Sequence, residues 1–318
     1  MNYNIRKDWR GYFSPSFYDK LTKGIWKPLM ELIAHDPELD VQIRKNYINV
    51  YYKGGNLLEI KSKGYKFDPH YFYNEDFDFY SKNIPITFIE KINAGKEIKK
   101  KRNNKDIIPD KILADKIIKE IKTREIELLD HFKSGRFKEY IAVAKQAMDS
   151  WRKNNKRNER KDQHYISLSN RSFSSSNNIV VVDIEFKLST NKNQHYYNNT
   201  GTSPSFDIIG IDETGQLYVI ELKENKSADG ENKKANVDNH LADFENSIGE
   251  DIKGDFISEI TQLVHIKNEL GLLSLKGIKV SKNKPIFAIS YSGENEDSFY
   301  SSHPDILHIK VKNHKLIK

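Results

Sequence analysis

The chain has 318 residues, of which 37% are apolar and 31% charged, so it carries enough apolar side chains for two ordinary domains or one large one. It contains no cysteine, which excludes disulfide scaffolds, zinc ribbons, iron–sulfur clusters and thiol nucleophiles. The N-terminus lacks the apolar segment of a signal peptide, and no stretch approaches the roughly 18 apolar residues of a membrane span. These features predict a folded cytoplasmic protein that does not contact a membrane.

The first 95 residues are expected to form a small α+β domain. Residues 41–52 alternate in the manner of a strand, and Gly54-Gly55-Asn56 is typical of a turn. Residues 57–61 can then pair back as the second strand of a hairpin.

The positive charge is concentrated in the middle of the chain. Residues 96–161 hold 21 Lys and Arg against 11 Asp and Glu, whereas the remainder holds 31 against 34. Apolar residues at steps of three and four predict amphipathic helices over about 110–133 and 136–152, so residues 96–135 are expected to form a basic helical connector. We expect the basic runs at the two ends of this segment to contact phosphate groups, the alternative being that they only solvate helix faces. The expected contacts are Lys99, Lys100, Lys101, Arg102, Arg152, Lys153, Lys156 and Arg157.

Residues 136–318 are predicted to form a third domain, of mixed α/β type. Residues 167–178 are rich in Ser and Asn and are expected to form a loop, and residues 256–270 to form a helix. Strands are expected over 179–188, 206–211, 217–222, 285–291 and 306–311.

Two of these strands form a hairpin that brings charged residues together. If Ile211 pairs with Leu217, then Asp207 faces Glu221, and Lys223 projects from the same face because side chains alternate with period two. Directly opposed carboxylates repel each other, and a divalent cation such as Mg²⁺ would convert that repulsion into coordination. A lysine beside such an ion can orient or help deprotonate an attacking water. The alternative is that all three residues are solvated strand ends.

The segments Ser205-Phe206-Asp207 and Glu221-Leu222-Lys223 resemble the signature of the PD-(D/E)XK nuclease superfamily, which includes many restriction endonucleases. The resemblance covers about residues 136–292 and implies a restriction-endonuclease-like mixed β-sheet flanked by helices in an α/β protein. It implies that Asp207 and Glu221 bind the metal, that the Leu222 carbonyl is a further ligand, and that Lys223 is the catalytic lysine. One departure is that Pro204 stands three residues before the aspartate instead of directly before it.

Many members of this superfamily add an acidic residue from the preceding helix or the first strand. We favour Glu185, which shares the polar face of its strand with Asp183, over Glu139; the alternative is a solvated or salt-bridged strand edge. Gln262 occupies a position from which related nucleases direct a polar side chain towards the site, although an ordinary surface role is favoured. His240 and His265 are expected to have surface or packing roles.

The predicted function is Mg²⁺-dependent hydrolysis of phosphodiester bonds in DNA, with Mn²⁺ as a substitute ion. Double-stranded DNA is the expected partner, a homodimer fits cleavage of both strands, and restriction or phage defence fits this class of nuclease. No nucleotide cofactor is expected, because the chain has no phosphate-binding Gly-rich loop. The alternative is a non-cleaving nucleic-acid-binding or assembly protein with a nuclease-like fold, which would use the basic segment for contacts with the phosphate backbone.

Overall fold

The computed structural model describes residues 6–62, 64–66, 136–154, 161–187, 204–223, 237–248, 253–291 and 300–318. The chain divides into two compact units, one of Met1–Lys66 with Glu159–Lys318 and one of Phe67–Asn158. The described parts of the predicted first domain therefore belong to the same unit as most of the predicted third domain. The predicted connector over residues 96–135 lies outside the described residues.

Of the second unit, the structure describes residues 136–154, which form helix α6 (Phe137–Asn154). This helix confirms the prediction over 136–152. Its buried side chains recur at steps of three and four, as expected for an amphipathic helix, and comprise Phe137, Tyr140, Ile141, Ala144, Ala147 and Met148. The helix predicted over 110–133 lies outside the described residues. None of the described helices is long and apolar enough to cross a membrane.

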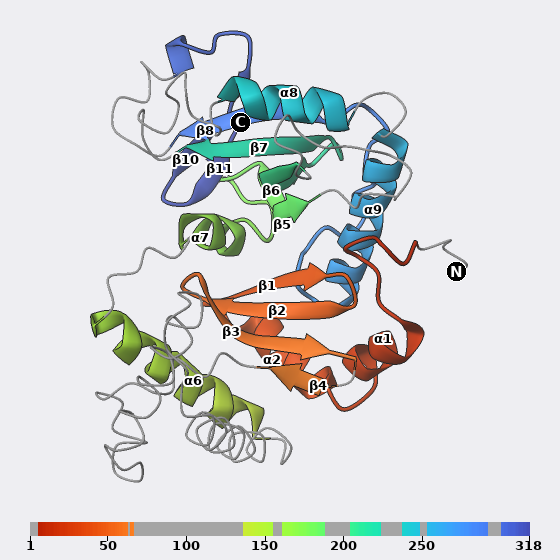
Figure 1. The fold of residues 1–318 in the computed structure, drawn as a ribbon, viewed down its shortest axis with the longest axis vertical. Helices are drawn as coiled ribbons and strands as arrows, with labels where there is room; N and C mark the ends of the chain where they lie inside the picture. The colour runs from red at the N-terminus through yellow and green to blue at the C-terminus, as the bar shows by residue number, and fades with distance from the viewer. Residues whose placement is uncertain are drawn as a thin grey trace, which may run out of the picture. The chain divides into compact units, whose positions relative to one another are not determined.

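The N-terminal part of the first unit contains two helices followed by a four-stranded antiparallel sheet. Its elements are α1 (Pro15–Thr22), α2 (Lys27–His35), β1 (Leu39–Arg44), β2 (Tyr47–Tyr52), β3 (Gly55–Lys61) and β4 (Gly64–Lys66) (Figure 1). The predicted hairpin is confirmed as the β2–β3 pair. The single strand predicted over 41–52 is wrong, because the chain turns between Arg44 and Tyr47 and forms β1 and β2. Asn46 takes the left-handed conformation there, with φ 58°, so no glycine marks the turn.

The C-terminal part of the first unit is built on a five-stranded mixed sheet in the order β5-β6-β7-β8-β9. The first three strands are antiparallel to one another, whereas β8 is parallel to β7 and β9 is parallel to β8. The strands of this sheet are β5 (Ile179–Lys187), β6 (Ser205–Asp212), β7 (Leu217–Lys223), β8 (Ile286–Tyr291) and β9 (Leu307–His308). The remaining elements are α7 (Lys161–Ser169), α8 (Val237–Ser247), α9 (Lys253–Glu269) and the hairpin of β10 (Lys310–Lys312) and β11 (Lys315–Ile317).

Most of these elements match the sequence-based expectation. The strands β5, β6, β7 and β8 and the helix α9 are confirmed. The last predicted strand, over 306–311, divides into β9 and β10, and the predicted loop over 167–178 begins with the last turn of α7. The helices α7 and α8 were not predicted; they are short, at nine and eleven residues, and α7 has no apolar stripe.

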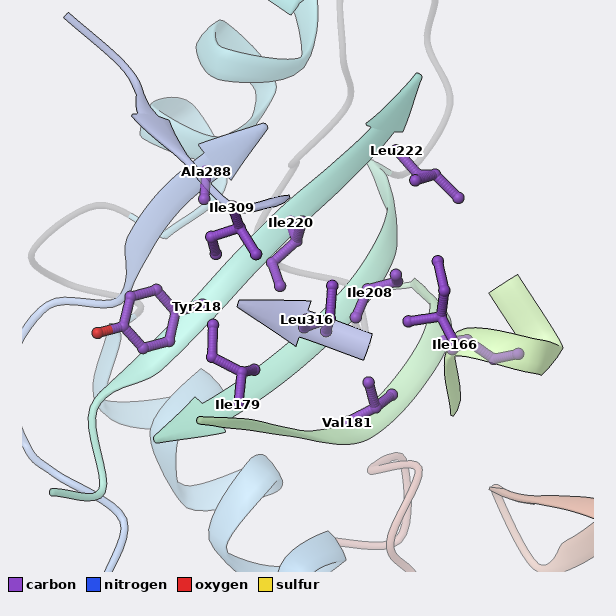
Figure 2. Packing of buried hydrophobic residues seen from close by; sticks show 11 residues of the cluster. Ile166, Ile179, Val181, Ile208, Tyr218, Ile220, Leu222, Ala288, Ile309 and Leu316 are labelled. Atoms are coloured by element: carbon purple, nitrogen blue, oxygen red, sulfur yellow. The ribbon is translucent and has the colours of Figure 1, made fainter. Parts of the chain in front are cut away.

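Apolar packing fixes the helices on the five-stranded sheet. Figure 2 shows the buried cluster in which Ile166 of α7 and Leu316 of β11 meet side chains of β7 such as Ile220. The ring of Phe244, on α8, lies 5.5 Å from the ring of Phe287 on β8. The register pairs Phe287 with Val219, whereas Ile220 belongs to the cluster in Figure 2. Because successive side chains of a strand alternate between faces, α7 and α8 cover opposite faces of a mixed α/β sheet.

Candidate active site

The hairpin of β6 and β7 has the register that the sequence predicts. Ile211 pairs with Leu217 and Ile209 with Val219. The turn contains Gly215 at φ 86°, and a Cβ atom added there would lie 1.9 Å from the carbonyl oxygen of Lys279. Only glycine fits this position without displacing the backbone, so the turn that sets the register depends on it.

Asp207 lies where the pairing of β6 with β7 ends. The last pair of the ladder is Ile208 with Ile220. The Oδ2 atom of Asp207 then accepts a hydrogen bond from the backbone N–H of Leu222, at 3.0 Å, and Oδ1 accepts one from Nε2 of Gln163 in α7, at 2.8 Å. The carboxylate thus contacts both β7 and α7.

Glu221 is buried at the same end of the hairpin, with 4% of its surface exposed. Its Oε1 atom lies 3.1 Å from Nζ of Lys223 and 3.2 Å from Nε2 of His240 in α8. Burial raises the pKa of Glu221 well above its ordinary value, and the charge of Asp207 and a hydrogen bond to its carboxyl raise it further. The predicted proximity of Asp207, Glu221 and Lys223 is therefore present in the structure.

His240 belongs to this site, contrary to the surface or packing role expected from the sequence. Burial lowers the pKa of His240 to about 4, and the positive charge of Lys223 contributes to this. The imidazole is thus neutral at pH 7, with Nε2 3.2 Å from Oε1 of Glu221. No sequence signal placed it there, because its position depends on α8 packing against the sheet.

The first strand of the sheet directs its acids towards the N-terminal part of the unit. Asp183 is buried and forms ion pairs with Arg10 and with Arg44, the latter at 2.9 Å. Glu185 lies across from Asp207, between the pairs Ile184–Ile208 and Phe186–Phe206, but its backbone is left-handed with φ 49°. Glu185 lies near Tyr51 of β2: burial raises the pKa of Tyr51, and the negative charge of Glu185 raises it further. The role of Glu185 as a third ligand stays a prediction.

The other candidate residues have different environments. Glu139, in α6, lies 3.5 Å from Arg136. Gln262 is buried instead of exposed, with its side chain against the position where a Cβ atom of Gly11 would lie. His265 lies 3.4 Å from Glu269 one turn along α9.

The predicted phosphate contacts fall in the second unit. Arg152 is a half-buried residue of α6, and Lys153 lies in the same helix, with its side chain outside the described part of the chain. The other six also lie outside the described ranges, namely Lys99, Lys100, Lys101, Arg102, Lys156 and Arg157. Their contacts with phosphate groups stay a prediction.

The donor set at Asp207 and Glu221 fits a hard divalent cation. Mg²⁺ commonly binds through one or two carboxylates and keeps several waters. Each carboxylate has about four acceptor positions, so the hydrogen bonds described above leave some of them for an ion. Within the described ranges no group of three or more His, Asp or Glu side chains could hold a metal. The register and the electrostatic interaction of Glu221 with Asp207 place these two carboxylates together. The Leu222 carbonyl as a further ligand stays a prediction.

Comparison of the chain with protein-family models, with curated proteins and with solved structures found no match. What this site does must therefore be argued from its own residues and their geometry.

Proposed function

We propose that the protein is a Mg²⁺-dependent nuclease of the PD-(D/E)XK type, with a restriction-endonuclease-like fold, that hydrolyses phosphodiester bonds in DNA. The observation that carries the proposal is the cluster of charged residues at the end of β6 and β7, in which Glu221 and Lys223 are buried and Asp207 is half-buried. It combines two carboxylates, Asp207 and Glu221, with Lys223, whose Nζ is 3.1 Å from Glu221. A strand hairpin that served only the fold would not need to hold a buried acid beside a second, half-buried one.

Each residue of the cluster has a role in this reaction. A bound Mg²⁺ supplies Lewis-acid activation of water and neutralisation of phosphate charge. Asp207 and Glu221 hold the ion, and their orientation is fixed by the backbone of Leu222 and by His240. Lys223 donates a hydrogen bond to Glu221, and its ammonium group orients the attacking water and stabilises charge that develops on the phosphate.

The substrate is inferred from the charge distribution. The segment of residues 96–161 exceeds neutrality by ten positive charges, since it holds 21 basic and 11 acidic residues. Such a segment binds a phosphate backbone without regard to sequence and brings the nucleic acid to the protein. Double-stranded DNA is the proposed partner, a homodimer would supply a second site for the second strand, and restriction or phage defence is the proposed setting.

The test is cleavage of supercoiled plasmid by the purified protein with Mg²⁺, with Mn²⁺ and with EDTA. We expect metal-dependent nicking that falls by about 10²- to 10³-fold in Lys223→Ala, as is typical for loss of one group that stabilises the transition state. Glu245→Gln is a matched control, because Glu245 lies on α8, as His240 does, but is exposed and paired with Lys284. Equal cleavage by the Lys223→Ala variant, or cleavage in EDTA, would contradict the proposal.

The alternative function is a non-cleaving nucleic-acid-binding protein, favoured by the same basic segment. It predicts salt-dependent binding of DNA with no metal-dependent nicking by the wild-type protein.

A further inference from the structure

Helix α7 has polar side chains that connect two different parts of the first unit. Gln163 donates a hydrogen bond from Nε2 to Oδ1 of Asp207, at 2.8 Å. The next residue, His164, contacts Asp40 of β1 in the N-terminal sheet, with 2.5 Å between Nδ1 and Oδ2. One helix of nine residues thus touches both the candidate active site and the N-terminal sheet.

Gln163 is a buried side chain in which one of the two polar atoms has a hydrogen-bond partner among the described residues. Its exposed fraction is 8%, and its amide group must direct N–H towards Asp207, because a carboxylate accepts and cannot donate. The carbonyl oxygen Oε1 is then left buried, with no hydrogen-bond partner among the described residues. An acceptor that is buried without a partner is destabilising, and a ligand that donates a hydrogen bond next to Asp207 would satisfy it.

The N-terminal sheet holds α7 through a buried network centred on Asp40. Besides His164, Asp40 accepts a hydrogen bond from Oγ of Ser167 at 2.8 Å, and Gln42 donates to the same Oγ at 3.1 Å. Asp40 and Gln42 are almost fully buried, at 2% and 0% exposure. His164 and Ser167 are three residues apart and thus lie on one side of the helix, so Asp40 fixes both the position and the rotation of α7.

We propose that Gln163 binds the attacking water through Oε1, and that Asp40 is a positioning residue that holds α7 in the rotation this contact requires. The inference rests on the proposed nuclease function and extends it, because it makes the N-terminal sheet part of the machinery that orients the nucleophile. The water donates one proton to Oε1 of Gln163 as a hydrogen bond, which leaves an oxygen lone pair free to point at the phosphorus. A displacement of about 1 Å at such a contact can lower the rate about 10²-fold, so the contacts of Asp40 with α7 are expected to affect the rate.

The test is a double-mutant cycle with Gln163→Met and Asp40→Asn, assayed for kcat and KM on plasmid DNA. Methionine keeps the size of glutamine and removes both polar atoms, and asparagine keeps the shape of aspartate and removes its charge. We expect Gln163→Met to lower kcat about 10²-fold with KM little changed, and Asp40→Asn to lower it about 10-fold. The double variant should then be no slower than Gln163→Met alone, because Asp40 acts only through Gln163.

Two further measurements separate positioning from loss of structure. Calorimetric binding of Mn²⁺ should be unchanged in Gln163→Met, and hydrogen exchange of the α7 amides should become faster in Asp40→Asn and unchanged in Gln163→Met. If Asp40→Asn does not fold, Ser167→Ala, a milder change in the same network, replaces it in the cycle. It should lower kcat when Gln163 is present and have no further effect in Gln163→Met.

The possible outcomes are distinct. Failure of the wild-type protein to cleave would overturn the proposed function. Wild-type cleavage with unchanged kcat in Gln163→Met, or with multiplying effects of the two substitutions, would overturn this inference alone. Loss of Mn²⁺ binding in Gln163→Met would also overturn it, because Gln163 would then serve to hold Asp207 in place instead of binding the water.

Discussion

The five-stranded sheet carries two clusters of buried charge that have opposite character. The first, here called the acidic cluster, comprises Asp207, Glu221, Lys223 and His240. The second, here called the bridging cluster, comprises Asp183 of β5 with Arg10, Arg44 and Lys267. In the bridging cluster burial alone would raise the pKa of Asp183, but the surrounding cations lower it below its ordinary value. In the acidic cluster burial and a like charge raise the pKa of Glu221.

The difference shows which cluster serves the fold and which is suited to chemistry. Asp183 is ionised with cations around it, and it joins β5 to the N-terminal segment and sheet through Arg10 and Arg44. Glu221 shares its surroundings with a second carboxylate, so the folded protein holds a repulsion that a divalent cation would relieve. A pKa displaced against the charged form, in a cluster of potential ligands, is what active sites commonly show.

The largest effect is expected for Asp183→Asn. This substitution removes the charge that both arginines neutralise and leaves two cations buried without a full partner. We expect the free energy of unfolding to fall by about 3–5 kcal/mol, measured by urea denaturation. A loss below about 1 kcal/mol would show that the bridging cluster does not hold the two parts of the unit together.

A smaller loss of stability is expected when low pH protonates Asp40. Burial would raise the pKa of Asp40, but the hydrogen bond and charge of His164, with Gln42 and Lys267, lower it to about 2 from an ordinary 3.8. A depressed pKa means that the unfolded state binds more protons between these values, so this stabilisation is complete above about pH 4 and is lost as the pH falls towards 2. It amounts to about 2 kcal/mol. The difference in unfolding free energy between wild type and Asp40→Asn should therefore narrow as the pH is lowered from about 5 to 3; a constant difference would contradict this assignment.

Glu221→Gln should have the opposite effect on stability. It removes the repulsion with Asp207, so in EDTA we expect the unfolding free energy to rise by about 0.5–2 kcal/mol, although cleavage is lost. Added Mg²⁺ should raise the melting temperature of the wild type and leave that of the variant nearly unchanged, because only the former binds the ion tightly. Destabilisation by Glu221→Gln in EDTA would mean that the acidic cluster serves the fold, as the bridging cluster does.

The smallest effect is expected for Glu245→Gln. Glu245 and Lys284 are 2.5 Å apart at the surface, with side chains 52% and 43% exposed. Exposed pairs contribute about 0–1 kcal/mol, so we expect a change within that range and unchanged cleavage. A larger change in unfolding free energy would show that an exposed ion pair can contribute as much to stability as the residues of the two buried clusters.

The sequence predicted the core of the candidate site but not the residues that surround it. The register of β6 and β7 follows from a short turn with Gly215 and from alternating apolar residues, so the placement of Asp207 near Glu221 could be inferred locally. Gln163 and His240 were missed because α7 and α8 are short helices that owe their places to contacts with the sheet. The bridging cluster was missed for a related reason, since Arg10 and Asp183 are 173 positions apart.

The sequence by itself determined the strands of the main sheet, the hairpin register and the approach of Asp207, Glu221 and Lys223. These features depend on neighbours within a few residues, and the period-two alternation of a strand carries them directly. Only the tertiary structure decided that Asp183 is neutralised by arginines, that His240 and Gln163 contact the two carboxylates, and that the N-terminal sheet anchors α7. Those outcomes depend on burial and on charges brought together from distant segments. Burial raises the pKa of a carboxyl group, and the charges around it decide whether the net shift is upward, as at Glu221, or downward, as at Asp183.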